Sequence, residues 1–314
     1  MHAILDTDIG SDIDDAMALL LCLRLADLRP RAITTVYGKV ELRARIAKKL
    51  VDLAGVDVPV AVGECMPISS PMGIWHTGEE GRGLLEPNEV ARPVEGLGIH
   101  FDAVQLLIEL AAEGPAPLDI IAIGPLTNIA RAIQREPRFA EQVGRIWAMI
   151  GGISYPDTPP DRPLAPGEAF IAQASHNVRC DVGATRIVLE SGIPVTMVGN
   201  DVTTRVRFNA ADIQGVEGEG STLNRAVMSL MRVWLAYRAQ LFGRPVTWTC
   251  LHDALVVAEA YGMGFTQRDP VDVDLSDDGI THVTANPKSH IDVSRAVDRS
   301  AFEQWYLGVV TASV

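Results

Sequence analysis

Five aspartates stand within ten residues near the start of the chain: Asp6, Asp8, Asp12, Asp14 and Asp15. Carboxylates this close repel one another unless a cation or hydrogen-bond donors hold them. A solvated acidic turn would explain the cluster, but apolar residues 3–5 precede it and apolar residues 16–23 follow it, so it joins two buried elements. Carboxylate oxygens suit hard cations such as Ca²⁺ and Mg²⁺, and Ca²⁺ is the more tolerant of many protein ligands in irregular geometry. The spacing therefore predicts a divalent-metal site.

The elements around the cluster would bring its side chains together. Asp6 and Asp8 are two residues apart at the end of an expected strand, so they point to the same side of it. Asp14 and Asp15 begin the following expected helix, where the positive end of the helix dipole favours carboxylates. We therefore expect the carboxylates to converge at the carboxyl end of a strand.

The expected strands are short apolar runs that alternate with helical patterns. These runs cover residues 3–5, 32–36, 58–62, 118–123, 146–150 and 195–198. Residues 41–53 and 102–112 have helical periodicity and are followed by Gly55 and Gly114, which are typical of helix ends. Alternating strands and helices predict an α/β fold with an open, mostly parallel sheet flanked by helices.

The size and charge of the chain limit the range of functions that it can have. A chain of 314 residues with 47% hydrophobic residues can bury a large core, and we expect residues 1–314 to form one domain. The formal net charge of −13 disfavours binding to DNA or RNA, which requires Lys and Arg to neutralise phosphates. A free nucleoside has no phosphate, so the charge does not exclude it.

The cysteines and the N-terminus bear on location. Cys22, Cys65, Cys180 and Cys250 are far apart and lack metal-type spacing, which is typical of reduced structural thiols. The first expected strand begins within three residues, which leaves no basic leader, and no apolar run approaches the ~18 residues of a membrane-spanning helix. We expect a cytoplasmic protein with no membrane partner.

Two segments interrupt the alternation of strands and helices. Residues 67–92 are rich in Gly and Pro, and residues 156–168 contain five prolines. Long irregular loops in compact domains are usually functional or disordered, and ligands of open α/β sheets bind outside the carboxyl ends of the strands. We expect both segments to form walls or lids of the pocket; a disordered surface loop is the alternative for the second.

Four separate motifs resemble the nucleoside hydrolase family, the inosine/uridine-preferring ribohydrolases. They read DTDIGSDIDDA at residues 6–16, IGPLTNIA at 123–130, SHN at 175–177 and HDALVVA at 252–258. The family opens with Asp-x-Asp-x-Gly-x-Asp-Asp-Ala, and this chain has two extra residues in that loop. The resemblance spans most of the chain. It implies the Rossmann-like fold of the family and assembly as a homodimer or homotetramer.

The resemblance also implies a metal site and two catalytic residues. Asp8, Asp15 and Asp253 match the family's carboxylate ligands, and the backbone oxygen of Ile123 matches a further ligand of Ca²⁺. Asp8 also matches the base that activates water. His252 matches the general acid that protonates the departing base, a role that its ordinary pKa of about 6.5 allows near neutral pH. A lone His beside an apolar segment is more often a core residue, but the adjoining Asp253 favours the catalytic role.

Other residues match substrate contacts of the family. Asp14, Asn177 and Asp253 match groups that bind ribose hydroxyls, and His76 corresponds approximately to a histidine of the base pocket. Because the opening loop has two extra residues, Asp12 is an alternative to Asp14 as a ribose contact. Asp14 is favoured because it keeps the family's Asp-Asp-Ala triplet.

The chain departs from the family at two substrate positions. After residues 32–36 the family commonly reads Gly-Asn, whereas this chain has Gly38 and Lys39, and the family's glutamate two residues before the ribose-binding asparagine is Ser175. Lys39 could pair with one of the clustered aspartates or reach an anionic group of the substrate. Removing an acid and adding a base favours the second role slightly. We therefore assign Lys39 to substrate binding and expect a sugar-modified or acid-bearing riboside to be a better substrate than common ribonucleosides.

These features predict calcium-dependent hydrolysis of the N-glycosidic bond of a nucleoside or nucleoside-like riboside, giving free base and pentose. A haloacid-dehalogenase-like phosphatase is one alternative, because Asp6-Thr7-Asp8 after an apolar strand resembles its nucleophile motif, although the Thr or Val that usually ends that motif is missing. A non-catalytic homologue that binds a riboside is the other, and Lys39 and Ser175 motivate it. The expected partner is the small-molecule substrate.

Overall fold

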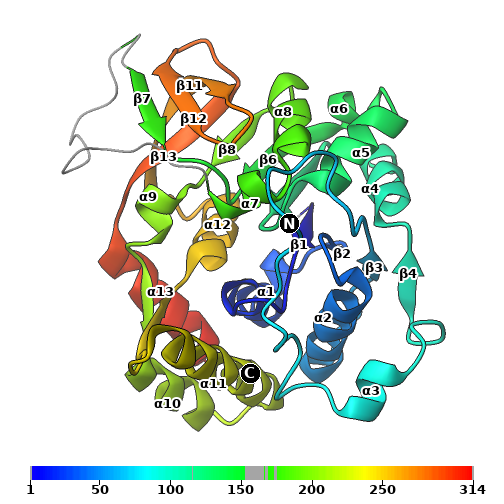
Figure 1. Ribbon diagram of the computed structural model, residues 1–314, viewed down its shortest axis with the longest axis vertical. Coiled ribbons are helices and arrows are strands. Elements are labelled where there is room, and N and C mark those ends of the chain that lie inside the picture. Colours follow the sequence, from blue (N-terminus) through cyan, green and yellow to red (C-terminus); the bar gives the residue numbers. More distant parts are fainter. Residues whose placement is uncertain (1, 115, 153–165, 167–168, 173–174, 313–314) are drawn as a thin grey trace.

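An open, mostly parallel sheet runs through the computed structural model of the protein (Figure 1). The structure describes residues 2–114, 116–152, 166, 169–172 and 175–312. Within these residues, eleven strands form one sheet in the order β4-β3-β2-β1-β5-β6-β8-β13-β11-β12-β7, and β9 and β10 form a separate antiparallel pair. The proline-rich segment 156–168, expected to form a wall of the pocket, lies outside the described residues except for residue 166.

The described strands are β1 (Ala3–Thr7), β2 (Ile33–Thr35), β3 (Val60–Val62), β4 (Ile99–Phe101), β5 (Leu118–Ala122), β6 (Val143–Ala148), β7 (Ala169–Ala172), β8 (Val195–Met197), β9 (Arg207–Asn209), β10 (Trp248–Cys250), β11 (Thr266–Leu275), β12 (Thr281–Ala285) and β13 (Ile291–Val297). The described helices are α1 (Asp14–Arg24), the 3-10 helix η1 (Ala26–Leu28), α2 (Val40–Ala54), α3 (Pro87–Ala91), α4 (Ala103–Ala112), α5 (Thr127–Arg135), α6 (Phe139–Gln142), α7 (His176–Cys180), α8 (Val182–Glu190), α9 (Asn200–Thr203), α10 (Ala210–Gly218), α11 (Thr222–Phe242), α12 (His252–Ala260) and α13 (Arg299–Val310). The prediction of an α/β fold is confirmed.

The six predicted strands lie in the parallel part of the sheet, which also contains β4 and β13. Within the run β4-β3-β2-β1-β5-β6-β8-β13, adjacent strands are parallel to each other, and Leu5 of β1 lies between Ile33 of β2 and Ile121 of β5. Strand β6 begins at Val143, earlier than its apolar run indicates, and its pairing with β5 has a register shift near this start. The two predicted helices occur as α2 and α4, and α2 ends at Gly55 in a left-handed conformation (φ 66°).

The far edge of the sheet is antiparallel. Strand β13 pairs with β8 in parallel and with β11 in antiparallel orientation, and β12 and β7 continue the antiparallel part. Strand β12 alternates between buried and exposed residues because one of its faces meets solvent. Strand β7 lies at the end of the sheet, next to β12 (Figure 1).

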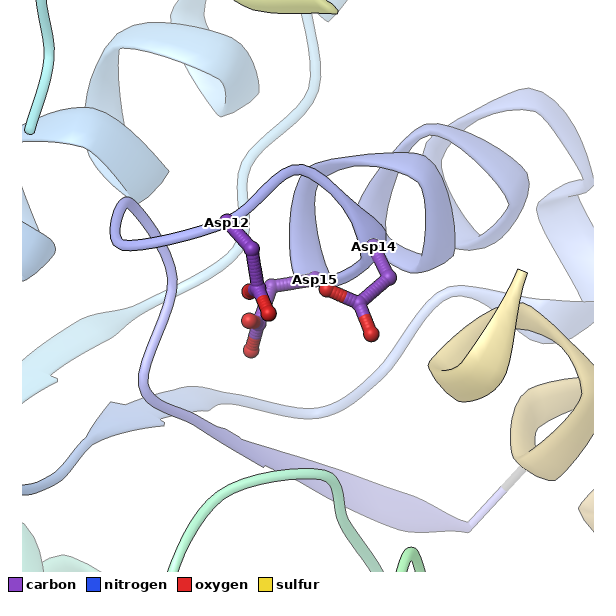
Figure 2. A group of neighbouring side chains, drawn as sticks. All are labelled: Asp12, Asp14 and Asp15. Carbon is purple, nitrogen blue, oxygen red and sulfur yellow. The ribbon is translucent and has the colours of Figure 1, made fainter. Parts of the chain in front are cut away.

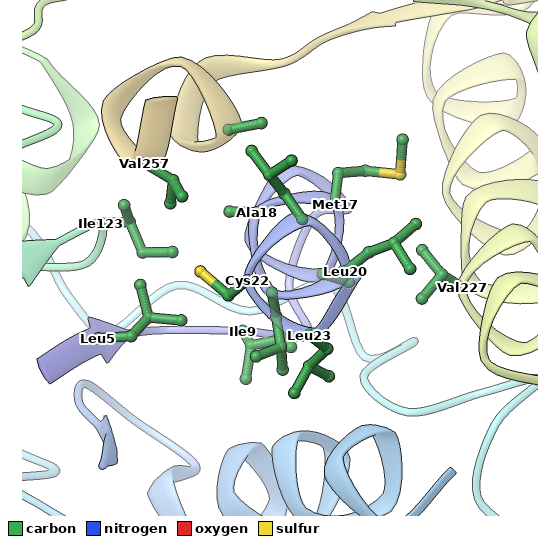
Figure 3. Close-up of a cluster of buried hydrophobic side chains, with 14 of the residues drawn as sticks. Leu5, Ile9, Met17, Ala18, Leu20, Cys22, Leu23, Ile123, Val227 and Val257 are labelled. Carbon is green, nitrogen blue, oxygen red and sulfur yellow. The ribbon is translucent and has the colours of Figure 1, made fainter. Parts of the chain in front are cut away.

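Helices cover both faces of the parallel sheet and produce two apolar layers. Successive residues of a strand point to opposite faces, so Leu5 packs in the layer with α1, α2, α11, α12 and α13, and Ile4 packs in the layer with α4, α5 and α8. Helix α1 is buried along residues 14–23, and Figure 3 shows its side chains between β1, α11 and α12. This enclosure explains why its sequence is apolar on all sides.

Two further observations concern the whole chain. All four cysteines are free, as expected from their spacing, and Cys22 and Cys180 are buried. Among the described residues, no helix is both long enough and apolar enough to cross a membrane.

Candidate active site

A pocket of about 290 Å³ opens at the carboxyl ends of β1, β5, β6 and β8. This is the edge at which ligands of open α/β sheets bind. Its lining residues are Asp8, Ser11, Asp12, Asp14, Asp15, Met72, Trp75, Ile123, Met149, His176, Asn177, Asn200, His252 and Asp253. One side of the pocket is therefore rich in carboxylates, and the rest combines amides, imidazoles and apolar side chains.

Three elements bring the carboxylates together. Asp8 follows β1, Asp14 and Asp15 form the first turn of α1, and Asp253 lies in the first turn of α12, which packs against α1. Asp12 belongs to the loop between β1 and α1, and its carboxylate lies with those of Asp14 and Asp15 within 4.8 Å (Figure 2). Both candidates for the ribose contact, Asp12 and Asp14, thus line the pocket.

Burial makes this arrangement electrostatically costly. Burial, together with repulsion between neighbouring carboxylates, raises the pKa of Asp14, Asp15 and Asp253 well above the ordinary value. Burial also raises the pKa of Asp8, against the lowering effect of the Arg43 guanidinium. A bound cation would oppose both effects, because an opposite charge nearby favours the ionised form.

Asp6 lies beneath the cluster and has a structural environment. Its Oδ1 accepts hydrogen bonds from the Thr34 hydroxyl and from Asn128 Nδ2 (2.7 Å), and burial raises its pKa to about 7. The same Asn128 amide donates to the Thr35 carbonyl (3.1 Å), and its Oδ1 accepts from the Glu64 amide (2.8 Å). Asn128, the last residue of the Gly-Pro-Leu-Thr-Asn motif, therefore ties the ends of β1 and β2 to the segment after β3.

The end of β5 lies close to Asp8. The Ile123 carbonyl accepts a hydrogen bond from Asn177 Nδ2 (2.8 Å), which also donates to the Met149 carbonyl (3.0 Å). A carbonyl oxygen has two lone pairs, so this bond leaves Ile123 one acceptor position. Gly124 permits the approach of β5 to β1, because a Cβ there would lie 2.9 Å from the Asp8 amide nitrogen.

His252 is held from behind by a hydroxyl. Its Nδ1 lies 2.7 Å from Thr203 Oγ1 in α9, which leaves Nε2 for the pocket. Burial, with a smaller contribution from the Arg238 charge, lowers the pKa of His252 to about 4 against the opposing effect of Asp12. The imidazole is therefore neutral at pH 7 when no ligand is bound. This differs from the ordinary pKa on which the sequence-based assignment relied, and the cause is the enclosure of the ring.

The wall without carboxylates comes from distant parts of the chain. Met72 and Trp75 belong to the Gly- and Pro-rich segment 67–92, which forms a wall of the pocket as predicted. The Trp75 ring meets the His176 ring edge-on, with the ring centres 5.4 Å apart. Asn200 begins α9 and lines the same pocket.

Some predicted site residues lie away from the pocket lining. The Lys39 side chain is 47% exposed, and its Nζ lies 3.5 Å from Glu80 Oε2, a partner outside the aspartate cluster. His76 is exposed, and its neighbour Trp75 is the residue that lines the pocket. The buried Ser175 hydroxyl accepts a hydrogen bond from the Gly151 amide (3.1 Å).

Several residues of the site escaped the sequence reasoning. Trp75 and His176 are direct neighbours of residues that were singled out, so an aromatic side chain beside each motif was the available signal. The roles of Arg43 and Thr203 depend on contacts between distant segments and had no local signal.

A sequence model of the family described as inosine-uridine preferring nucleoside hydrolase matches residues 3–304. The chain belongs to this family. The pyrimidine-specific ribonucleoside hydrolase of Salmonella arizonae is 30% identical to it in an alignment of 264 residues that covers 81% of this chain and 78% of that relative.

Solved structures agree with the family. A plant nucleoside hydrolase matches with a TM-score of 0.80 and 25% identity, covering 99% of this chain and 98% of that chain. A purine-preferring ribonucleoside hydrolase from Gardnerella vaginalis has a TM-score of 0.79 at 22% identity, covers 98% of both chains, and supports the fold alone.

Membership of the nucleoside hydrolase family has three consequences. The protein is an N-glycosyl hydrolase whose reaction is the hydrolysis of a nucleoside N-glycosidic bond. The family implies a metal-dependent enzyme, and the acidic group at Asp12, Asp14 and Asp15 is suited to a cation. The phosphatase and the non-catalytic homologue are therefore set aside.

Proposed function

We propose that this nucleoside hydrolase uses Ca²⁺ to split a nucleoside or nucleoside-like riboside into free base and pentose. The observation that carries the proposal is the convergence of buried carboxylates from β1, α1 and α12 on one pocket. Such a set costs free energy unless a cation accompanies it, because burial and like charge both oppose ionisation.

The donor atoms fit a hard cation. Asp8, Asp15 and Asp253 would hold it through carboxylate oxygens, with the Ile123 carbonyl as a further ligand, and Ca²⁺ prefers oxygen ligands in flexible geometry. When bound, the cation would lower the pKa of water and orient the sugar hydroxyls. The set contains no thiolate, which argues for Ca²⁺ over Zn²⁺.

The side chains of the pocket would each have a separate role in the reaction. Asp8 would accept a proton from the attacking water, and the sugar would pass through an oxocarbenium-like state as in glycoside hydrolysis. Asp14, Asn177 and Asp253 would bind the ribose hydroxyls. In the structure, Asn177 uses its Nδ2 on two backbone carbonyls, so its Oδ1 is the group available to accept from the sugar.

His252 would assist departure of the base. A neutral imidazole with its Nε2 toward the pocket can donate a hydrogen bond to the leaving nitrogen. Negative charge that develops on the base would raise the pKa of the adjacent imidazole and favour proton transfer at that moment. The acid role thus depends on the charge of the departing base and not on an imidazolium already present.

Four further assignments stay predictions. Lys39 and His76 would meet a substrate group that extends beyond the pocket lining. Comparing kcat/KM for inosine, uridine and 5′-modified analogues between wild type and Lys39→Asn tests the assignment of Lys39. A homodimer or homotetramer and a cytoplasmic location complete the set. The Salmonella relative is named for pyrimidine nucleosides, so uridine and cytidine belong with inosine in any substrate panel.

Release of free base from such a panel tests the proposed function. We expect turnover that disappears after exhaustive chelation and returns with Ca²⁺. Asp15→Ala should abolish turnover and Ca²⁺ binding together, whereas Asp57→Asn, at an exposed position outside the pocket lining, should preserve both. Stoichiometric zinc in the purified protein, or full activity after chelation, would refute the assignment of Ca²⁺. Absence of turnover on every nucleoside would refute the proposed substrate class.

A further inference from the structure

Tyr37 has an unusual backbone conformation beside the pocket. It follows β2 with φ 68°, in the left-handed region that residues other than glycine seldom adopt. Such a conformation is strained and persists only where surrounding contacts determine it, often near functional sites. Here the Tyr37 amide donates to the Glu64 carbonyl (2.8 Å), and its carbonyl accepts from Arg43 Nε (2.7 Å).

The Tyr37 hydroxyl both donates and accepts a hydrogen bond. The side chain is buried among Val36, Cys180, Met72 and Ile74. Its hydroxyl accepts a hydrogen bond from the Trp75 amide (2.9 Å) and donates to the Gly73 carbonyl (3.3 Å). One phenol therefore fixes the backbone on both sides of Ile74, in a stretch that has no helix or strand of its own.

This stretch carries one wall of the pocket. Trp75 lines the pocket and meets the ring of His176, which is adjacent to Asn177. The backbone position of Trp75 thus decides where its indole stands relative to the sugar-binding side chains.

The other side of Tyr37 leads to the aspartate loop. The Arg43 guanidinium that donates to the Tyr37 carbonyl also donates to the Ile9 carbonyl (3.1 Å) and to Ser11 Oγ (3.1 Å). Ser11 and the adjacent Asp12 line the same pocket as Trp75. Tyr37 and Arg43 together therefore connect the two walls through hydrogen bonds.

We propose that Tyr37 is a positioning residue that sets substrate affinity by holding the Trp75 wall at a fixed distance from the aspartate loop. It lies outside the pocket lining and so acts through Trp75. The inference rests on the proposed function only in that a nucleoside must enter this pocket. Loss of the Tyr37 hydroxyl should therefore change KM and leave kcat nearly unchanged. The hydrogen bonds that hold the proposed catalytic carboxylates and His252 do not involve this hydroxyl.

Tyr37→Phe tests the proposal by removing the hydroxyl and keeping the ring. We expect KM for the best nucleoside to rise about three- to tenfold, the effect of one lost hydrogen bond, with kcat within about twofold. Tyr306→Phe is the matched control, since Tyr306 is equally buried and its hydroxyl donates to the Met17 carbonyl (3.0 Å), away from the pocket. It should lower thermal stability without changing KM. Equal KM values in wild type and Tyr37→Phe, or the same rise in Tyr306→Phe, would overturn the proposal.

A second measurement needs no substrate. Amide hydrogen exchange in peptides covering residues 70–78 should be faster in Tyr37→Phe than in wild type, and unchanged in Tyr306→Phe. Unchanged exchange in both variants would refute the positioning role even if nucleosides are turned over. Faster exchange with an inactive wild type would keep the positioning role and reject the proposed function. The two proposals can therefore fail separately.

Discussion

At the scale of single residues, His252 has the most specific expected effect. Its Nδ1 is occupied by Thr203, so only Nε2 can serve a leaving group in the pocket. A base such as hypoxanthine or uracil needs a proton or hydrogen bond to depart, whereas nitrophenolate leaves without one. The contribution of His252 should therefore depend on the leaving group.

His252→Ala should lower kcat for nucleosides by about 10² to 10⁴, the usual contribution of a general acid. Hydrolysis of a nitrophenyl riboside should fall far less, because its leaving group is already stable as an anion. Steady-state kinetics on both substrates measures the difference. Equal losses on the two substrates would instead assign His252 to sugar positioning or to folding.

At the scale of elements, the one-turn helix α9 supports His252, the proposed general acid. It begins at Asn200 and ends at Thr203, so a single turn places one side chain in the pocket and another behind the imidazole. The Thr203 side chain is fully buried, and its hydroxyl can fix both the tilt and the tautomer of the ring.

Thr203→Val should reproduce part of the His252→Ala effect. Valine has nearly the shape of threonine but leaves Nδ1 without a partner, so we expect a loss of kcat on nucleosides of about tenfold, the effect of one buried hydrogen bond. Thr203→Ser, which keeps the hydroxyl, should restore most of the activity. In the double variant Thr203→Val/His252→Ala the losses should not add, because both act on the same ring. Additive losses would show that Thr203 acts independently of His252.

The elements also show what could be predicted from sequence. Parallel strands that are buried on both faces appear as continuous apolar runs, and this signal predicts β1, β2, β3, β5, β6 and β8. The edge strand β4 is mostly exposed and lacks the signal. Strand β11 reads TQRDPVDVDL, in which polar residues and Pro270 hide the strand pattern. Its pairing with β13 and β12 depends on tertiary contacts that its sequence does not display.

In the site, too, contacts between residues far apart in the sequence could not be predicted. The aspartates of the opening loop were found because their spacing is local and resembles a family motif. Tyr37 and Trp75 are 38 residues apart and Thr203 and His252 are 49 apart, so neither pair has a periodic signal. What escaped prediction is therefore the aromatic wall of the pocket and the residues that support the site, and not the acidic cluster.

At the scale of the whole molecule, the acidic cluster opposes folding when no cation is bound. Asp14, Asp15 and Asp253 have pKa values raised by burial and mutual repulsion, so they bind protons more tightly in the folded chain than in the unfolded chain. Below about pH 4, the pKa of these carboxyls in the unfolded chain, they do not reduce the free energy of unfolding. They reduce it as pH rises toward their higher pKa in the folded chain. These groups should thus make the cation-free protein progressively less stable as pH rises above about 4.

Thermal unfolding with and without Ca²⁺ tests this linkage. At pH 8, Ca²⁺ at 100 times its Kd should raise Tm on the order of 5 °C, from about 2.7 kcal/mol of binding free energy. The rise should shrink toward pH 5, because protons then compete with the cation for the same oxygens.

Asp15→Asn removes one ligand and one repelling charge, so its cation-free Tm at pH 8 should exceed that of wild type while its response to Ca²⁺ is largely lost. Asp57→Asn, with the same change in charge at an exposed position, should behave as wild type. A Ca²⁺-induced rise in Tm that is equal at pH 5 and pH 8, or a lower cation-free Tm in Asp15→Asn, would contradict a cluster whose carboxylates are strained by their own repulsion.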